Sequence, residues 1–179
     1  MKLCIFCSAN HQIDHDFFGM THELGEWAAR NGHTIVFGGH DAGLMHCVSK
    51  AAKEAGGTII GVVPRVIEQM GRLSPDLDVH IPTENLTDRK DLMMDRSDAF
   101  IVLPGGIGTL DELFTTAAAA TLQYHEKPII LWNMKGFWDS LIACLDDLQE
   151  KGVIRGQWRD GIHVANSLEE VLLKVKSEE

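Results

Sequence analysis

The chain has 179 residues, of which 45% are hydrophobic and 23% charged, and this suits one globular domain spanning 1–179. Its formal net charge of −10 argues against nucleic-acid and membrane-surface binding, because those partners attract basic proteins. No apolar run approaches membrane-span length and no signal peptide opens the chain, so we expect a cytoplasmic protein.

Short apolar runs alternate with segments of helical period along the chain. We expect strands at 2–7, 34–37, 58–63, 79–81, 99–103, 128–132 and 163–165. We expect helices at 17–30, 43–55, 86–96, 137–150, from 110 onward, and from a capping box at 167–170. Segment 65–76 shows no clear preference, and 153–162 is interpreted as a polar connection containing Trp158. The alternation predicts an α/β fold, a doubly wound parallel sheet of about seven strands with helices on both faces.

The four cysteines include a C-x-x-C pair, Cys4 and Cys7. Both lie in the first predicted strand, where residues three apart point to opposite faces. A zinc or redox pair needs a turn or a helix start and further ligands. Buried free thiols are therefore the favoured interpretation.

A glycine-rich turn at 104–109 joins the strand at 99–103 to the helix that follows. Gly105, Gly106 and Gly108 would let backbone N–H groups close on an anion, and the helix N-terminus would add its positive dipole end. The alternative is a plain tight turn in which Thr109 and Glu112 form a capping box; the two interpretations are compatible. We favour a phosphate site, with Glu112 ionised because it lies near the helix N-terminus.

A second glycine-rich turn begins with Gly38 and Gly39 at the end of the second predicted strand. Two such turns beside the switch point of a doubly wound sheet would line one crevice. His40, Asp41 and His46 could be imagined as metal ligands, but their spacing matches no zinc pattern. We interpret them as solvated loop residues and expect no metal.

Two further features stay open on the residues alone. Arg89 and Lys90 are either a solvated basic helix face or a contact for a phosphate. The alanines at 117–120 pack either against the sheet or, less favoured, against a second copy of the chain.

These motifs together resemble the Lonely Guy (LOG) family, whose members are often labelled lysine decarboxylase-like after a motif. The carriers of the resemblance are Gly-Gly-x-x-x-Gly-Leu-Met at 38–45, Arg89-Lys90, and Pro-Gly-Gly-x-Gly-Thr-x-x-Glu at 104–112. It extends from the first strand to about Val175, essentially the whole chain.

The resemblance implies a Rossmann-like fold, a homodimer or dimer-based oligomer, and an enzyme. The reaction would be hydrolysis of the N-glycosidic bond of nucleoside 5′-monophosphates, cytokinin riboside monophosphates or AMP, to free base and ribose 5-phosphate without a cofactor. Arg89 and Glu112 match the catalytic pair. The nucleotide-binding residues would be Gly105, Gly106, Gly108, Thr109, Lys90, Met45, Gly39 and Ser8.

The sequence departs from the family pattern in three places beside the expected crevice. His40 and His46 stand where the family usually has glycine, and Ser8-Ala9-Asn10 stands where it tends to have a Gly-Ser pair. The departures support an alternative from another class, a non-catalytic nucleotide or molybdenum-cofactor carrier on the same fold. For the enzyme, we expect an ionised Glu112 to act as base or electrostatic stabiliser, and Arg89 to orient it or the substrate.

Overall fold

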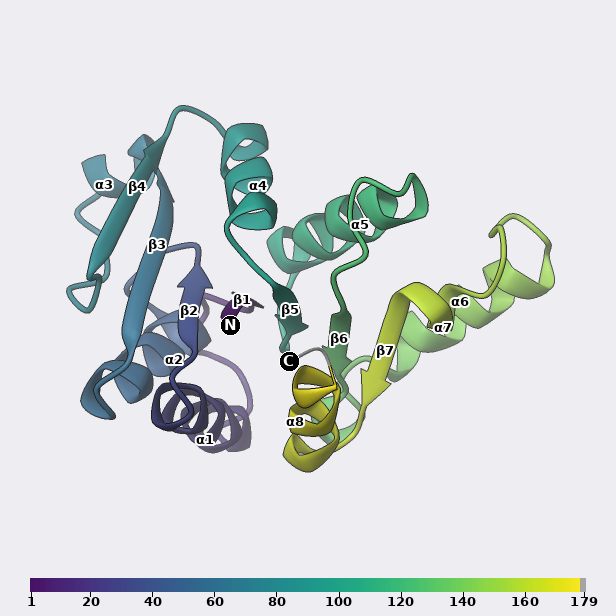
Figure 1. Ribbon diagram of the computed structural model, residues 1–179, viewed down its shortest axis with the longest axis horizontal. Helices are drawn as coiled ribbons and strands as arrows, with labels where there is room; N and C mark the ends of the chain where they lie inside the picture. The colour runs from purple at the N-terminus through teal and green to yellow at the C-terminus, as the bar shows by residue number, and fades with distance from the viewer. Residues whose placement is uncertain (178–179) are drawn as a thin grey trace.

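The computed structural model, which describes residues 1–177, contains one parallel sheet with the strand order β4-β3-β2-β1-β5-β6-β7 (Figure 1). The strands are β1 Lys2–Phe6, β2 Thr34–Phe37, β3 Thr58–Pro64, β4 Val79–Thr83, β5 Ala99–Val102, β6 Ile129–Trp132 and β7 Ile162–Ala165. Every neighbouring pair runs parallel. The predicted α/β fold is confirmed.

Helices cover both faces of this sheet. They are α1 Asp16–Arg30, α2 Gly43–Glu54, α3 Arg65–Gln69, α4 Leu86–Asp95, α5 Ile107–Thr121, η1 Met134–Gly136 (a 3-10 turn), α6 Asp139–Glu150, α7 Trp158–Gly161 and α8 Leu168–Lys176. Apolar side chains of α1, α2 and α8 form the core on one face, and those of α4, α5 and α6 on the other. Cys4 and Cys7 are buried in opposite cores as free thiols, as predicted.

The termini of α8 and α5 illustrate one prediction that is confirmed and one that is wrong. Ser167 caps α8 by accepting a hydrogen bond at 3.2 Å from the Glu170 N–H. The helix after β5 begins at Ile107, before the expected 110, and Gly106 is its N-cap residue without any side-chain cap. The alternative of a capping box formed by Thr109 and Glu112 is not realised, because both residues lie inside the helix and the Glu112 carboxylate accepts from Arg89 instead.

Two short helices were not predicted. α3 forms in the segment without a clear pattern and buries none of its residues. α7 interrupts the expected polar connection, because Trp158 is buried against the α5–α6 face and donates its indole N–H to Asp146 at 2.8 Å. One aromatic side chain thus anchors an otherwise polar segment, which a periodicity criterion does not detect.

The chain changes direction between β1 and β5, and three turns meet at the carboxyl edge of this switch point. The Ser8 N–H donates to the Pro104 carbonyl at 3.0 Å, joining the turns after β1 and β5. The Leu44 N–H donates to the Ser8 carbonyl at 2.9 Å, joining the start of α2. Ligands of open α/β sheets bind in the crevice at such a point. No helix within residues 1–177 is long and apolar enough to span a membrane.

Candidate active site

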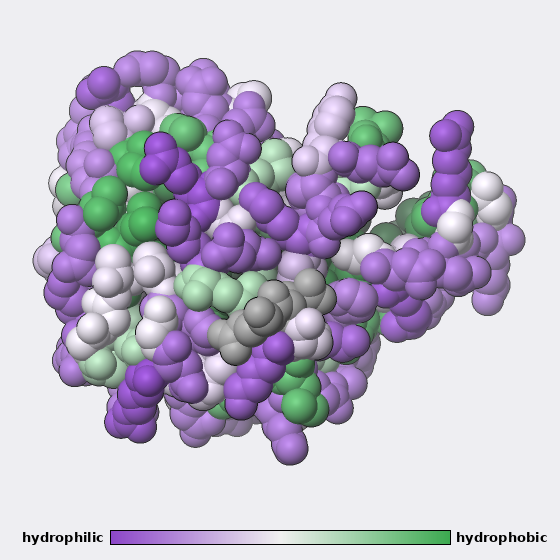
Figure 2. Space-filling view, viewed as in Figure 1, coloured by the Kyte–Doolittle hydropathy of each residue, from purple (hydrophilic) through white to green (hydrophobic). Residues whose placement is uncertain are grey.

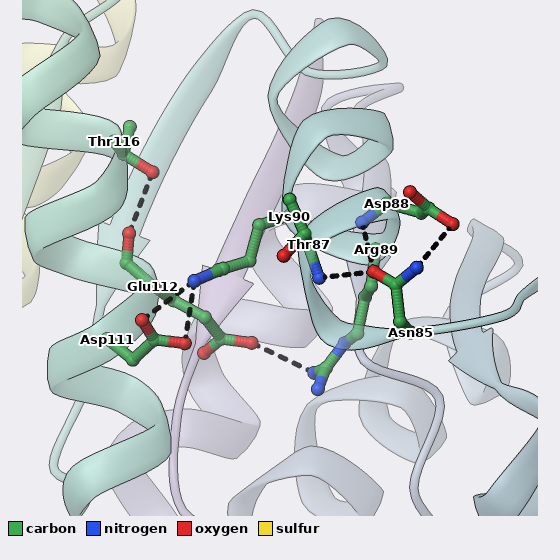
Figure 3. Close-up of polar contacts among 8 residues, drawn as sticks. All are labelled: Asn85, Thr87, Asp88, Arg89, Lys90, Asp111, Glu112 and Thr116. Atoms are coloured by element: carbon green, nitrogen blue, oxygen red, sulfur yellow. Dashed lines mark hydrogen bonds and ion pairs between the residues drawn. The ribbon is translucent and has the colours of Figure 1, made fainter.

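An arginine and a glutamate from two different helices meet beside this switch point. Arg89 on α4 donates from Nη2 to Oε1 of Glu112 on α5 at 2.9 Å (Figure 3). The side chains are 15% and 6% exposed, so this is a nearly buried ion pair. Nε of Arg89 is buried and has no hydrogen-bond partner among the described residues.

The N-terminus of α4 is defined by Asn85. Its side-chain oxygen accepts hydrogen bonds from the N–H groups of Thr87 at 2.9 Å and Asp88 at 3.0 Å (Figure 3). This cap satisfies backbone donors that the first turn would otherwise leave unpaired. Arg89 follows one turn later, so the cap sets where its side chain leaves the helix.

Gly38, at the end of β2, makes room for the Arg89 guanidinium. A Cβ atom at position 38 would lie 2.0 Å from Arg89 Nη2 and 3.4 Å from Cε of Met45. Any side chain there would displace the arginine. The turn after β2 therefore lies directly against the Arg89–Glu112 pair, as the predicted shared crevice requires.

The glycine-rich turn before α5 combines one packed and two open glycines. A Cβ atom at Gly105 would lie 2.1 Å from Oγ1 of Thr109, whose buried hydroxyl faces this residue. Cβ atoms at Gly106 and Gly108 would meet nothing within 4 Å. Packing explains the first glycine, while the other two keep the backbone at the helix N-terminus uncovered, which suits an approaching anion.

Burial decides the protonation of Glu112. Desolvation raises its pKa from 4.5 to about 7, and the nearby Arg89 cation lowers it without cancelling that effect. Asp111 raises the pKa further and Lys90 lowers it. The expectation of a carboxylate kept fully ionised by the helix dipole is wrong, because a dipole effect of roughly 0.3–1 kcal/mol is smaller than the desolvation of a buried charge.

Arg89 and Lys90 are not a solvated basic face. Nζ of Lys90 lies 2.7 Å and 2.9 Å from the two carboxylate oxygens of Asp111, next to the Arg89–Glu112 contact (Figure 3). No role for Asp111 followed from the sequence alone. A signal for this contact was present, because the adjacent cations Arg89 and Lys90 on one helix match the adjacent anions Asp111 and Glu112 on the next.

Three other predicted residues take distinct places around the crevice. Gly39 has φ +71°, and a Cβ there would lie 2.3 Å from Cγ2 of Val63, so backbone conformation and packing already require this glycine. Met45 is buried, and its Cε lies 3.4 Å from the place that a Cβ at Gly38 would take. Ser8 contributes the backbone groups that join the three turns.

Two of the residues that depart from the family pattern lie at the start of α2, His40 on the turn before it and His46 in its first turn. Nδ1 of His46 lies 2.7 Å from Oδ1 of Asp41. Nδ1 of His40 is buried with no partner among the described residues, and burial together with Arg72 lowers the pKa of this imidazole. Within residues 1–177 no group of three or more His, Cys, Asp or Glu side chains is arranged to hold a metal ion.

The fold and site define a Rossmann-like α/β protein with a buried Arg–Glu pair beside a glycine-rich helix start. The model of a family described as "Possible lysine decarboxylase" matches residues 45–175, and the chain belongs to this family, the LOG family. The resemblance drawn from the motifs is thereby confirmed.

In named relatives, about a third of the aligned residues are identical to those of this chain. It is 35% identical to the cytokinin riboside 5′-monophosphate phosphoribohydrolase of Mycobacterium tuberculosis, over 95% of this chain and 90% of that protein. It is 32% identical to the phosphoribohydrolase LOG3 of Arabidopsis thaliana, over 98% of this chain and 81% of that protein. Among solved structures, the molybdenum cofactor carrier protein of Chlamydomonas reinhardtii is similar with 26% identity and a TM-score of 0.74, covering 99% and 96% of the two chains.

Proposed function

We propose that this protein hydrolyses the N-glycosidic bond of nucleoside 5′-monophosphates, releasing the free base and ribose 5-phosphate. The observation that carries the proposal is the buried Arg89–Glu112 pair beside a glycine-rich helix start. Relatives named as cytokinin riboside 5′-monophosphate phosphoribohydrolases support the same reaction class. AMP or a cytokinin riboside monophosphate is the proposed substrate.

Phosphate binding would hold the substrate at a distance from the bond that breaks. The uncovered backbone of Gly106 and Gly108 would receive the phosphate at the N-terminus of α5, with Thr109 and Gly105 shaping the turn. Met45, Gly39 and Ser8 would line the crevice toward the base and ribose. Binding energy from the phosphate then positions the anomeric carbon against Glu112.

Glu112 would act as the general base. Cleavage of a ribosyl bond passes through an oxocarbenium-like transition state, which a carboxylate stabilises. The ionised form takes a proton from a water whose oxygen attacks the anomeric carbon, while the C–N bond breaks and its electron pair leaves with the nucleobase. The departing nucleobase takes up a proton, and Glu112 returns its own proton to solvent. A pKa of about 7 suits this role, because a base is most effective when its pKa lies near the working pH. Arg89 would orient the carboxylate and bind the ribose or phosphate through the exposed part of its guanidinium.

Incubation with AMP, followed by chromatography of free adenine, tests the proposal. We expect base release by the native protein and loss of nearly all of it in Glu112→Ala and Arg89→Ala, with melting temperatures still showing a folded chain. Glu26→Ala, which removes an exposed partner of Arg30 on α1, is the matched control and should retain activity. Near-normal turnover in Glu112→Ala would contradict the mechanism.

A molybdenum-cofactor or nucleotide carrier is the second candidate. Carrier proteins among the similar structures favour it, as does the unpartnered Nδ1 of His40 in the crevice turn. Tight binding of a phosphorylated ligand without release of base, measured by calorimetry and chromatography on one sample, would favour the carrier over the enzyme.

We further propose a homodimer or an assembly of dimers in the cytoplasm. A groove of about 650 Å³ lies between α5 and the α6–α7 segment, and Figure 2 presents this side of the molecule as hollowed. Its lining includes Phe114, Ala118, Leu148 and Trp158. Large exposed apolar patches are rare on monomers and usually mark interfaces. A second copy presenting the same α5 face is the proposed occupant.

A further inference from the structure

A second ion pair lies parallel to the proposed catalytic pair. Lys90 and Arg89 are neighbours on α4, Asp111 and Glu112 are neighbours on α5, and each cation contacts one carboxylate across the space between the helices (Figure 3). Lys90 is bound by both oxygens of Asp111, and its side chain is only 18% exposed. Both contacts therefore help to fix the distance between α4 and α5.

Few other contacts fix the distance of α4 from α5. Met93 is its only fully buried residue, Leu92 and Met94 are partly buried against the same core, and the Lys127 ammonium donates to the Met94 carbonyl at 2.6 Å. A helix with so small an apolar face is held weakly by packing. The position of Arg89 over Glu112 therefore depends strongly on polar contacts.

Lys90 retains capacity for a ligand while it holds Asp111. An ammonium has three N–H donors, and the contacts with the two oxygens of Asp111 use two of them. One donor remains for a ribose hydroxyl or a phosphate oxygen. A role in holding the helices is compatible with the proposed nucleotide contact.

We propose that Asp111 is a positioning residue: by binding Lys90 it sets α4 so that Arg89 meets Glu112. An isolated ion pair with one exposed partner contributes little to global stability, and Asp111 is 46% exposed. The effect of Asp111 is therefore on geometry and charge at the site. The expected effect of Asp111 on catalysis rests on the proposed function. Its effect on the titration of Glu112 does not.

Several charged and titratable groups face Glu112. Arg89 and Lys90 on α4 lower its pKa, and Asp111 on its own helix raises it. The thiols of Cys4 in β1 and of Cys7 just after it also interact electrostatically with Glu112, and burial raises the pKa of both, so they stay neutral at ordinary pH. Loss of the Asp111 charge removes the one neighbouring anion and frees Lys90, so both effects shift the titration of Glu112 to lower pH. Loss of the Lys90 charge shifts it to higher pH.

The test uses Asp111→Asn, Lys90→Gln and the charge exchange Lys90→Asp with Asp111→Lys in the full chain. For each, kcat and KM for AMP are measured across pH, and the Glu112 carboxyl is titrated by carbon-13 NMR. We expect each single variant to lose roughly tenfold or more in kcat, since small misplacements at a catalytic site cost this much. The Glu112 titration should move in opposite directions in the two. The exchange should recover much of the loss in kcat, while KM stays raised because the Lys90 donor for the ligand is absent.

Asp147→Asn, which breaks the exposed Lys151–Asp147 pair on α6, is the matched control and should change neither quantity. The proposal is overturned if Asp111→Asn keeps kcat within about twofold of the native value. It is equally overturned if the Glu112 titration stays unmoved in both single variants. If the native protein releases no base at all, the proposed function fails, and the NMR titration alone then decides the role of Asp111.

Discussion

Glu112 lies in the second turn of α5, close enough to the N-terminus for the dipole to favour its anion, yet its pKa lies near 7. Burial has removed the water around this carboxylate, and the contact with Arg89 only partly replaces the lost hydration. If this residue is the general base, we expect kcat/KM for AMP to rise as pH increases through about 7. A pH-rate profile checks this, and activity that falls over the same range would assign an acid role instead.

The same shift has a consequence for stability. Folded Glu112 holds its proton up to about pH 7, whereas the unfolded chain releases it near 4.5. The folded state thus binds more protons between these values, so this group lowers the free energy of unfolding as pH rises through the window. Glu112→Gln should remove that decline, which thermal melts below, within and above the window would detect. An unchanged pH dependence would contradict the raised pKa.

Gly38 offers a way to move Arg89 without altering it. The Cβ of Gly38→Ala would occupy the place of the Arg89 guanidinium, the mobile end of a long side chain, so the fold should tolerate the change. We expect a folded chain with a lowered melting temperature, because Glu112 loses its buried partner, and a loss of base release approaching that of Arg89→Ala. Gly19→Ala is the control, because a Cβ there meets nothing within 4 Å. Being inside α1, it should leave activity intact and stabilise by roughly 0.5–1 kcal/mol.

At the scale of elements, α4 is the helix whose placement matters most. Asn85→Ala removes its cap and should lower the free energy of unfolding by roughly 0.5–2 kcal/mol. Ser167→Ala removes the corresponding cap of α8, far along the chain from the site, with a destabilisation of the same order. We expect base release to fall only in Asn85→Ala, as denaturant unfolding and the adenine assay would reveal. Equal activity in both variants would show that the start of α4 does not position Arg89.

The predicted elements differ in how far local pattern decided them. The segment expected to be helical at 17–30 is α1 within one residue, because its apolar residues recur with helical spacing. The start of α5 was placed three residues late, since glycine at 106 and 108 gives no helical signal even though the turn directs the chain into the helix. α7 depends on the burial of Trp158 against distant elements, which no local pattern contains.

At the scale of the whole molecule, the groove between α5 and α6 predicts assembly. Phe114→Glu should place a charge on the proposed interface and convert a dimer into a monomer, which light scattering after gel filtration would detect. Val66→Glu alters an apolar residue of α3 that is 51% exposed and serves as control. A native protein that is monomeric, or a Phe114→Glu variant that remains dimeric, would contradict this interface.

The sequence by itself determined the order of the seven strands and the longer helices, and the glycine-rich turns at the carboxyl ends of two strands. It also determined the motif order that identifies the family, because these are properties of contiguous residues. Only the tertiary structure decided that Arg89 reaches Glu112, 23 residues away, and that Lys90 reaches Asp111. It also decided that burial overrides the helix dipole at Glu112. Contacts and desolvation depend on how α4 lies beside α5, and that arrangement brings together residues far apart in the sequence.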